Sequence, residues 1–304
     1  MNSLSNTAVA RDPGSVIIEV AINGARTRST HPHVPLSIDE IVASIEACAQ
    51  NGATVFHVHA GLPVVGAGGH HDSAVYIEAF ARVLERRPGL LLYPTLPGGG
   101  AGTRMAERLQ HVRELAGHGM AGFIPVDPGT MNYGAIDAQG APPESGAVYQ
   151  TTFADTSWAL KLARELKLPC TLSAFEPGFV RLAEAHRLAG TLPPGSIVKL
   201  EFSSGRRLFG LSPDAEGLDA WLRLFDPGRL PWMVTLRDGN VCDHLAALAL
   251  ARGGHVRVGL EDYSGPQAWR NEELVAQART LALAQGRRLA HVEELQELLH
   301  MTVA

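Results

Sequence analysis

The chain has 304 residues, of which 45% are hydrophobic and 19% charged, with 26 basic against 31 acidic side chains. This composition is typical of a folded globular protein and excludes collagen, disordered chains and small disulfide scaffolds. The formal net charge of −5 argues against a nucleic-acid partner, because that binding needs a surplus of Lys and Arg to neutralise phosphates.

The N-terminus and the apolar runs predict no membrane partner. Residues 1–14 are polar and lack the apolar core of a secretory signal, so we expect a flexible tail followed by one folded domain over residues 15–304. No window approaches the roughly 18 apolar residues that cross a bilayer. Cys48, Cys170 and Cys242 are widely spaced among apolar residues, as reduced thiols of a cytoplasmic protein are.

Short apolar, β-branched runs recur along the chain and predict eight strands. They span residues 15–22, 54–59, 90–96, 122–126, 170–175, 196–202, 232–236 and 255–260.

Segments with helical apolar spacing separate these strands. Four examples are residues 37–50, 73–86, 154–166 and 240–251, and the first begins with Ser37 three residues before Glu40, which is a capping box. Eight alternating units over about 250 residues favour a single (β/α)8 TIM barrel over an open doubly wound sheet. Residues 266–286 then form the eighth helix, and residues 291–300 an extra C-terminal helix.

A barrel places its functional site at the carboxyl ends of the strands, and the second strand ends in His57-Val58-His59. Residues two apart on a strand point to the same side, so both imidazoles can bind one metal ion. The eighth strand neighbours the first in a closed barrel, which brings Glu261 close enough to complete the ligand set. The alternative is that these histidines only bond backbone or water.

Arg257 and the third strand supply further candidates. Arg257 lies four residues before Glu261 on the same face, where it either pairs with Asp262 or Glu261 or binds a substrate carboxylate. Thr95 is followed by a glycine run that includes Gly98 and Gly99, where backbone amides can approach a phosphate or pantetheine group closely. Residues 70–72 (HHD) are weaker candidates for metal binding, because their loop is rich in glycine.

Several strings of residues resemble the β-keto acid cleavage enzymes, whose named member cleaves 3-keto-5-aminohexanoate. The resemblance runs from about residue 15 to residue 300, and residues 254–262 match that family's eighth-strand signature almost residue for residue. The matching strings are residues 22–25 (INGA), 31–35 (HPHVP), 51–53 (NGA), 57–59 (HVH), 129–134 (GTMNYG) and 254–262 (GHVRVGLED).

The resemblance implies a TIM barrel that binds zinc and converts a β-keto acid and acetyl-CoA into an acyl-CoA and acetoacetate. It implies a homo-oligomer, commonly a tetramer. The implied zinc ligands are His57, His59 and Glu261. The implied catalytic groups are Asp262 as the general base, Arg257 beside it and Thr95, while Gly98 and Gly99 are assigned to the acetyl-CoA site.

The implied substrate-binding residues are Asn23, Arg26 and Ser173, and two of them depart from the family pattern. Members that handle an amino-bearing substrate carry acids at the positions of Arg26 and Ser173. We therefore expect a substrate tail that is not cationic. If the tail is anionic, Arg26 would pair with its carboxylate. The alternative is that Arg26 is only a surface residue. The segment His59-Ala60-Gly61 and the segment around Pro125 also differ from the family.

Two alternatives stay open on the residues alone. A metal-dependent aldolase or lyase without an acetyl-CoA co-substrate would use the same ligand set. A ligand-binding barrel without turnover would also keep the fold, although it would have no need for a base such as Asp262 beside the metal.

Overall fold

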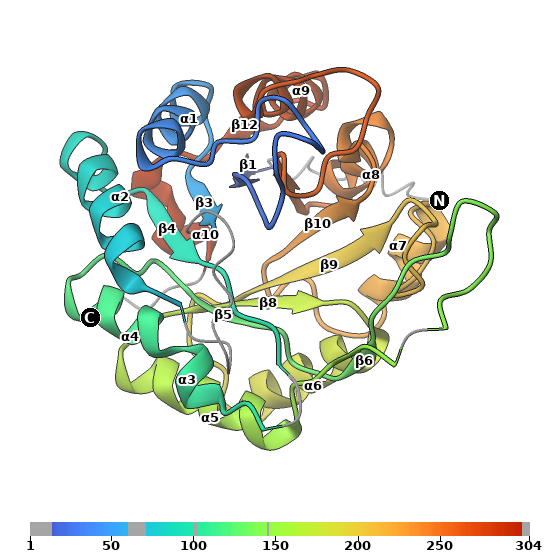
Figure 1. Ribbon diagram of the computed structural model, residues 1–304, viewed down its shortest axis with the longest axis horizontal. Coiled ribbons are helices and arrows are strands. Elements are labelled where there is room, and N and C mark those ends of the chain that lie inside the picture. The colour runs from blue at the N-terminus through green and yellow to red at the C-terminus, as the bar shows by residue number, and fades with distance from the viewer. Residues whose placement is uncertain (1–13, 60–70, 100–101, 145, 300–304) are drawn as a thin grey trace, which may run out of the picture.

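The computed structural model describes residues 14–59, 71–99, 102–144 and 146–299. Eight parallel strands curl into a nearly closed barrel surrounded by helices, which confirms the predicted fold (Figure 1). Their order around the barrel is β4-β3-β2-β11-β10-β9-β8-β5. The strands are β2 (Ile18–Ala21), β3 (Val55–Val58), β4 (Leu91–Pro94), β5 (Ile124–Val126), β8 (Cys170–Ala174), β9 (Ile197–Ser203), β10 (Trp232–Arg237) and β11 (His255–Val258).

The remaining gap in the barrel lies between β4 and β5. One backbone bond crosses it, because Gly122 N, just before β5, donates to Leu92 O at 2.7 Å. Both edges therefore face each other closely enough for side chains from all eight strands to share one interior.

Helices cover the outside of the barrel. The predicted capping box begins α1, since Ser37 Oγ accepts from Glu40 N at 3.2 Å and Glu40 Oε2 accepts from Ser37 N at 3.0 Å. No helix in the described ranges is long and apolar enough to cross a membrane. The helices are α1 (Ile38–Gln50), α2 (Ser73–Arg86), α3 (Met105–Arg108), α4 (Gln110–Gly117), α5 (Phe153–Glu165), α6 (Pro177–Leu188), α7 (Ala215–Leu222), α8 (Leu245–Ala251) and α9 (Asn271–Ala284).

One predicted helix, over residues 240–251, is interrupted. A 3-10 turn (Val241–Asp243) precedes α8, and His244 between them has a non-helical φ of −153°. The side chain of Asn240 bonds Cys242 N and caps the short turn, so the local hydrogen bonds favour two pieces over one helix.

The first predicted strand is also divided, and its first part closes the base of the barrel. β1 (Ser15–Val16) leaves the barrel and pairs with β12 (Arg288–Leu289), while β2 continues into the barrel wall. The C-terminal helix α10 (Leu295–Leu298) follows, shorter than predicted, and His300 lies outside the described residues. Leu295 and Leu299 pack against the buried base residues Ile17 and Met233.

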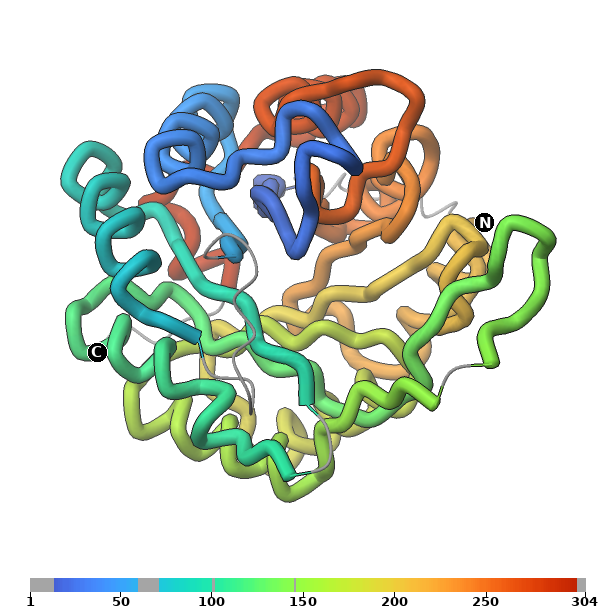
Figure 2. The backbone as a smooth tube through the Cα atoms, viewed as in Figure 1, coloured from blue at the N-terminus to red at the C-terminus, as the bar shows by residue number. Residues whose placement is uncertain are grey.

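Two further features lie at the carboxyl end of the barrel. The hairpin of β6 (Met131–Asn132) and β7 (Val148–Tyr149), which the sequence did not predict, extends from one side of the barrel. On the opposite side, residues 22–37 and 259–270 lie side by side (Figure 2), where the rings of His31 and Tyr263 meet edge to face with centroids 6.0 Å apart. These segments frame the entrance to the barrel.

Candidate functional site

A cavity of about 530 Å³ opens at the carboxyl ends of the strands. In a β/α barrel this is the end where active sites form. Cationic side chains outnumber carboxylates on its wall, so the cavity favours anionic ligands. The cationic side chains are Arg26, Lys199, Arg207, Arg237 and Arg257, and the carboxylates are Asp127, Asp238 and Glu261.

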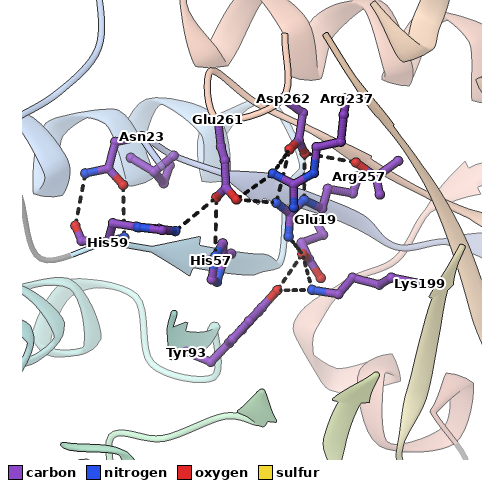
Figure 3. Close-up of polar contacts among 12 residues, drawn as sticks. Glu19, Asn23, His57, His59, Tyr93, Lys199, Arg237, Arg257, Glu261 and Asp262 are labelled. Carbon is purple, nitrogen blue, oxygen red and sulfur yellow. Dashed lines mark hydrogen bonds and ion pairs between the residues drawn. The ribbon is translucent and has the colours of Figure 1, made fainter. Parts of the chain in front are cut away.

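Three of the predicted metal ligands converge on one side of this cavity (Figure 3). Glu261 Oε2 lies 3.3 Å from His57 Nε2 and 3.5 Å from His59 Nε2, and the candidate ligand atoms all lie within 4.8 Å of one another. His59 Nε2 and Glu261 Oε2 are buried and form no hydrogen bond with any described residue. Two imidazoles and a carboxylate whose buried atoms lack hydrogen bonds fit a divalent metal ion. No other such group occurs in the described part of the chain.

Burial keeps His57 in the form that binds metals. Removal from water lowers the pKa of His57 well below its ordinary value, and the positive charge of Arg257 adds to this effect, although Glu261 opposes it. The imidazole is therefore neutral at physiological pH, as a metal ligand must be.

Asn23 fixes the backbone of His59. Its Nδ2 donates to His59 O at 3.0 Å and to Pro35 O at 3.2 Å, while its Oδ1 accepts from His59 N at 3.0 Å. Because both polar atoms of the amide bind the chain itself, Asn23 orients His59, and its role as a substrate ligand stays a prediction. This positioning contact was not expected from the sequence.

Arg257 and Asp262 form a buried pair beside the metal ligands. Arg257 Nε donates to Asp262 Oδ2 at 2.8 Å, and its Nη2 lies 3.3 Å from Asp262 Oδ1 and 3.1 Å from Glu261 Oε1. Thr235 Oγ1 also donates to Asp262 Oδ2, at 2.9 Å. Arg257 was expected to pair with Asp262 or Glu261 or to bind a substrate carboxylate, and it contacts both acids. Asp262 is only 3% exposed and does not border the cavity, whereas Arg257 does.

The sequence analysis missed a second arginine, Arg237, at the end of β10. Its Nη1 lies 2.8 Å from Glu261 Oε1 and 2.7 Å from Asp262 Oδ1 (Figure 3). Its Nε donates to Glu201 Oε2 at 3.1 Å. Burial by itself would lower the pKa of Arg237, but the nearby carboxylates of Asp262, Glu201 and Glu261 raise it by more. The pKa of Arg237 therefore lies above its ordinary value. Arg237 therefore remains a cation.

A polar layer lies below these residues inside the barrel and was also not predicted. Tyr93 OH donates to Glu19 Oε1 at 2.5 Å, and Lys199 Nζ donates to Tyr93 OH at 2.8 Å. Arg257 Nη1 reaches the same Glu19 oxygen at 3.3 Å. The charged pair at positions 199 and 201 in an otherwise apolar strand was the available signal, because residues two apart share a face.

The structure places the other predicted residues around the same cavity. Arg26, Thr95 and Ser173 border it, and Arg26 Nη1 also donates to the backbone oxygen of Tyr263. Gly98 and Gly99 border it as well, but a Cβ on Gly99 would lie 1.9 Å from Gln150 O, so packing alone requires that glycine. Their predicted contact with acetyl-CoA remains untested.

Residues 70–72 were the weaker candidates for metal binding, and the two that the structure describes make other contacts. His70 lies outside the described residues. The ring of His71 is stacked on Tyr76, and Asp72 caps α2 by accepting from Ala74 N at 2.9 Å.

Comparisons with known proteins agree on the family to which this chain is similar. A family model described as beta-keto acid cleavage enzyme matches residues 15–301. The 3-keto-5-aminohexanoate cleavage enzyme of Fusobacterium nucleatum is 26% identical, with 94% of this chain and 98% of the relative covered. The 3-oxoadipate:acetyl-CoA acetyltransferase of Cupriavidus necator is also 26% identical, with 93% and 94% covered.

The similarity to solved structures concerns the fold. ObcA, in a ternary complex with a C4-CoA adduct and oxalate, aligns with a TM-score of 0.63 and 16% identity. The alignment covers 88% of this chain and 67% of ObcA.

Proposed function

Because the chain belongs to the β-keto acid cleavage enzyme family, we propose that it converts a β-keto acid and acetyl-CoA into an acyl-CoA and acetoacetate. The observation that carries this proposal is the convergence of His57, His59 and Glu261 in an anion-attracting cavity. Relatives named as acetyl-CoA-dependent transferases of keto acids support the co-substrate. The family match favours an enzyme over a ligand-binding barrel.

We propose that His57, His59 and Glu261 hold a zinc ion. When bound, zinc would act as a Lewis acid on the carbonyl oxygen of the β-keto acid. Asn23 keeps His59 in place, and the arginines beside Glu261 hold its second oxygen, so that Oε2 faces the histidines.

Asp262 is the proposed base. It would accept the proton from the carbon between the keto and carboxylate groups, and the resulting carbanion would attack the acetyl carbonyl of acetyl-CoA. The adduct would expel CoA thiolate, which would then attack the original keto carbon and form the acyl-CoA. This attack breaks the bond between the original keto carbon and the deprotonated carbon, and that carbon would take the proton back from Asp262 to leave as acetoacetate. Arg257 and Thr235 orient Asp262 through the contacts described above. Thr95 offers a hydroxyl at the cavity wall.

Arg26 is the proposed contact for the tail of the substrate. It borders the cavity, and its position is occupied by an acid in members that take amino-bearing substrates. We expect Arg26→Glu to weaken turnover of β-keto acids with an anionic tail and to favour cationic ones. An unaltered substrate profile would remove Arg26 from the site.

A mass-spectrometric screen tests the reaction. Purified protein of known metal content would be incubated with a panel of β-keto acids, each with and without acetyl-CoA. We expect acetoacetate together with a new acyl-CoA for at least one panel member, only when acetyl-CoA is present. Cleavage without acetyl-CoA would instead identify a lyase.

The remaining proposals concern the state of the protein. The family resemblance implies a homo-oligomer, a tetramer, which light scattering would test. A cytoplasmic location agrees with three cysteines that form no disulfide among the described residues.

A further inference from the structure

Arg237 has a free side facing the cavity. Its Nε is bonded to Glu201, and its Nη1 contacts both Glu261 and Asp262. Its Nη2 bonds no residue in the part of the chain that the structure describes. A guanidinium carries two N–H donors on that nitrogen. The side chain borders the cavity and is 19% exposed, so these donors are open to a ligand.

Arg257 is less able to receive a ligand, although it was the arginine first expected to do so. Each of its three nitrogens already contacts a carboxylate, namely that of Glu19, Glu261 or Asp262, and the side chain is 1% exposed. Lys199 Nζ is likewise engaged, with Tyr93 OH and Glu19. Among these three cations, only Arg237 combines a contact with Glu261 and a nitrogen that bonds no described residue.

The position of Arg237 defines the ligand group. A charged donor that is partly removed from water is stabilised by an anion, and arginine suits a carboxylate in particular. The contact with Glu261 Oε1 places this donor beside the proposed metal ligand, where the reacting end of the substrate must lie. Arg26, by contrast, is anchored to Tyr263 at the edge of the entrance.

We propose that Arg237 Nη2 binds the carboxylate of the β-keto acid and thereby selects an acid over a neutral ketone. This inference rests on the proposed function, because it assumes that a β-keto acid enters this cavity. It assigns Arg257 to holding Asp262 and Glu261, and Arg237 to recognising the substrate. Glu201 fixes the orientation of Arg237 through Nε.

Calorimetry on the metal-loaded protein tests this assignment. The two probes are acetoacetate and acetoacetamide, which have nearly the same shape but differ in charge. We expect Arg237→Met to weaken acetoacetate binding at least tenfold and to change acetoacetamide binding by less than threefold. Arg237→Lys keeps a cation and should retain an intermediate acetoacetate affinity. Arg86→Met removes an exposed arginine that pairs with Glu46 on the outer helices, and should behave as wild type.

Metal analysis of each variant separates loss of the ligand from damage to the metal site. If Arg237→Met does not retain metal, Arg237→Lys is compared with wild type instead. The proposal then requires that the ratio of acetoacetate affinity to acetoacetamide affinity is smaller in Arg237→Lys than in wild type. Equal losses for both probes, or unchanged acetoacetate affinity, would overturn the assignment while leaving the proposed function intact. A wild type that binds no acetoacetate would overturn both.

Discussion

Gly24 lies directly against the side chain of Glu261. A Cβ atom on Gly24 would be 2.5 Å from Cγ of Glu261, and the backbone of Gly24 has a φ of +58°. The glycine is therefore needed both for its conformation and for the space that the proposed metal ligand occupies.

Gly24→Ala should displace Glu261 and lower the metal content of the purified protein by at least half. Gly190→Ala is the matched control, because Gly190 has a similar φ of +66° and no atom within 4 Å of a Cβ. Both substitutions place an alanine at a positive φ, which costs about 1 kcal/mol of folding free energy. Only Gly24→Ala also places a methyl group against Glu261. Equal metal content in the two would show that Glu261 tolerates the added methyl group.

Replacing both His57 and His59 with Ala should abolish metal binding. The two imidazole nitrogens lie 3.3 and 3.5 Å from the same Glu261 oxygen, and one carboxylate alone binds zinc weakly. Elemental analysis of wild-type and variant protein checks this. Full retention of metal by the double variant would mean that the ion binds elsewhere.

Asp262→Asn should keep the metal and lower kcat by about 10²- to 10⁴-fold, which is the usual contribution of a general base. Thr235→Val provides a comparison, because it removes the hydroxyl that donates to Asp262 Oδ2 but leaves the carboxylate. We expect a much smaller loss of kcat in that variant. A similar kcat in wild type and Asp262→Asn would remove Asp262 from the mechanism.

His255 should make the protein sensitive to acid independently of catalysis. Its Nδ1 accepts from Ile17 N at 3.1 Å, and burial lowers its pKa to about 3. Above pH 6.5 both folded and unfolded forms are neutral, but below it only the unfolded chain takes up the proton. The free energy of unfolding therefore falls as the pH drops from 6.5 towards 3, by up to about 1.4 kcal/mol per pH unit.

His255→Asn keeps a hydrogen-bond acceptor but cannot titrate. Urea unfolding of both proteins between pH 7 and 4 should show a shallower decrease in stability for the variant. Parallel curves would show that His255 does not account for the acid sensitivity.

The strands and the metal ligands could be predicted because their signals are local. Apolar β-branched runs locate the strands, and His57 and His59 share a face because they are two residues apart. Glu261 is the exception, because its place beside the histidines was predicted from the closure of the barrel and not from a local pattern. The hairpin of β6 and β7 was missed because its two strands are very short and its pairing joins distant loop residues.

The contacts among the charged side chains inside the barrel could not be predicted from local sequence patterns. The seventh predicted strand ends at Leu236 and leaves out Arg237, whereas β10 includes Arg237, whose side chain contacts Glu261. Glu19 lies in an apolar strand whose residues are all buried, and only the assembled barrel shows that Tyr93, Lys199 and Arg257 surround it. Such contacts depend on three-dimensional neighbours from four strands.

The base of the barrel has a consequence for synthesis on the ribosome. β1 is translated before the barrel strands, whereas its partner β12 and the residues that cover Ile17 and Met233 are translated after them. A nascent chain therefore exposes the apolar underside of its barrel until residues 288–299 have left the exit tunnel. We expect a protein truncated before Arg288 to bind chaperones and to aggregate, even though every residue of the proposed metal site is already present.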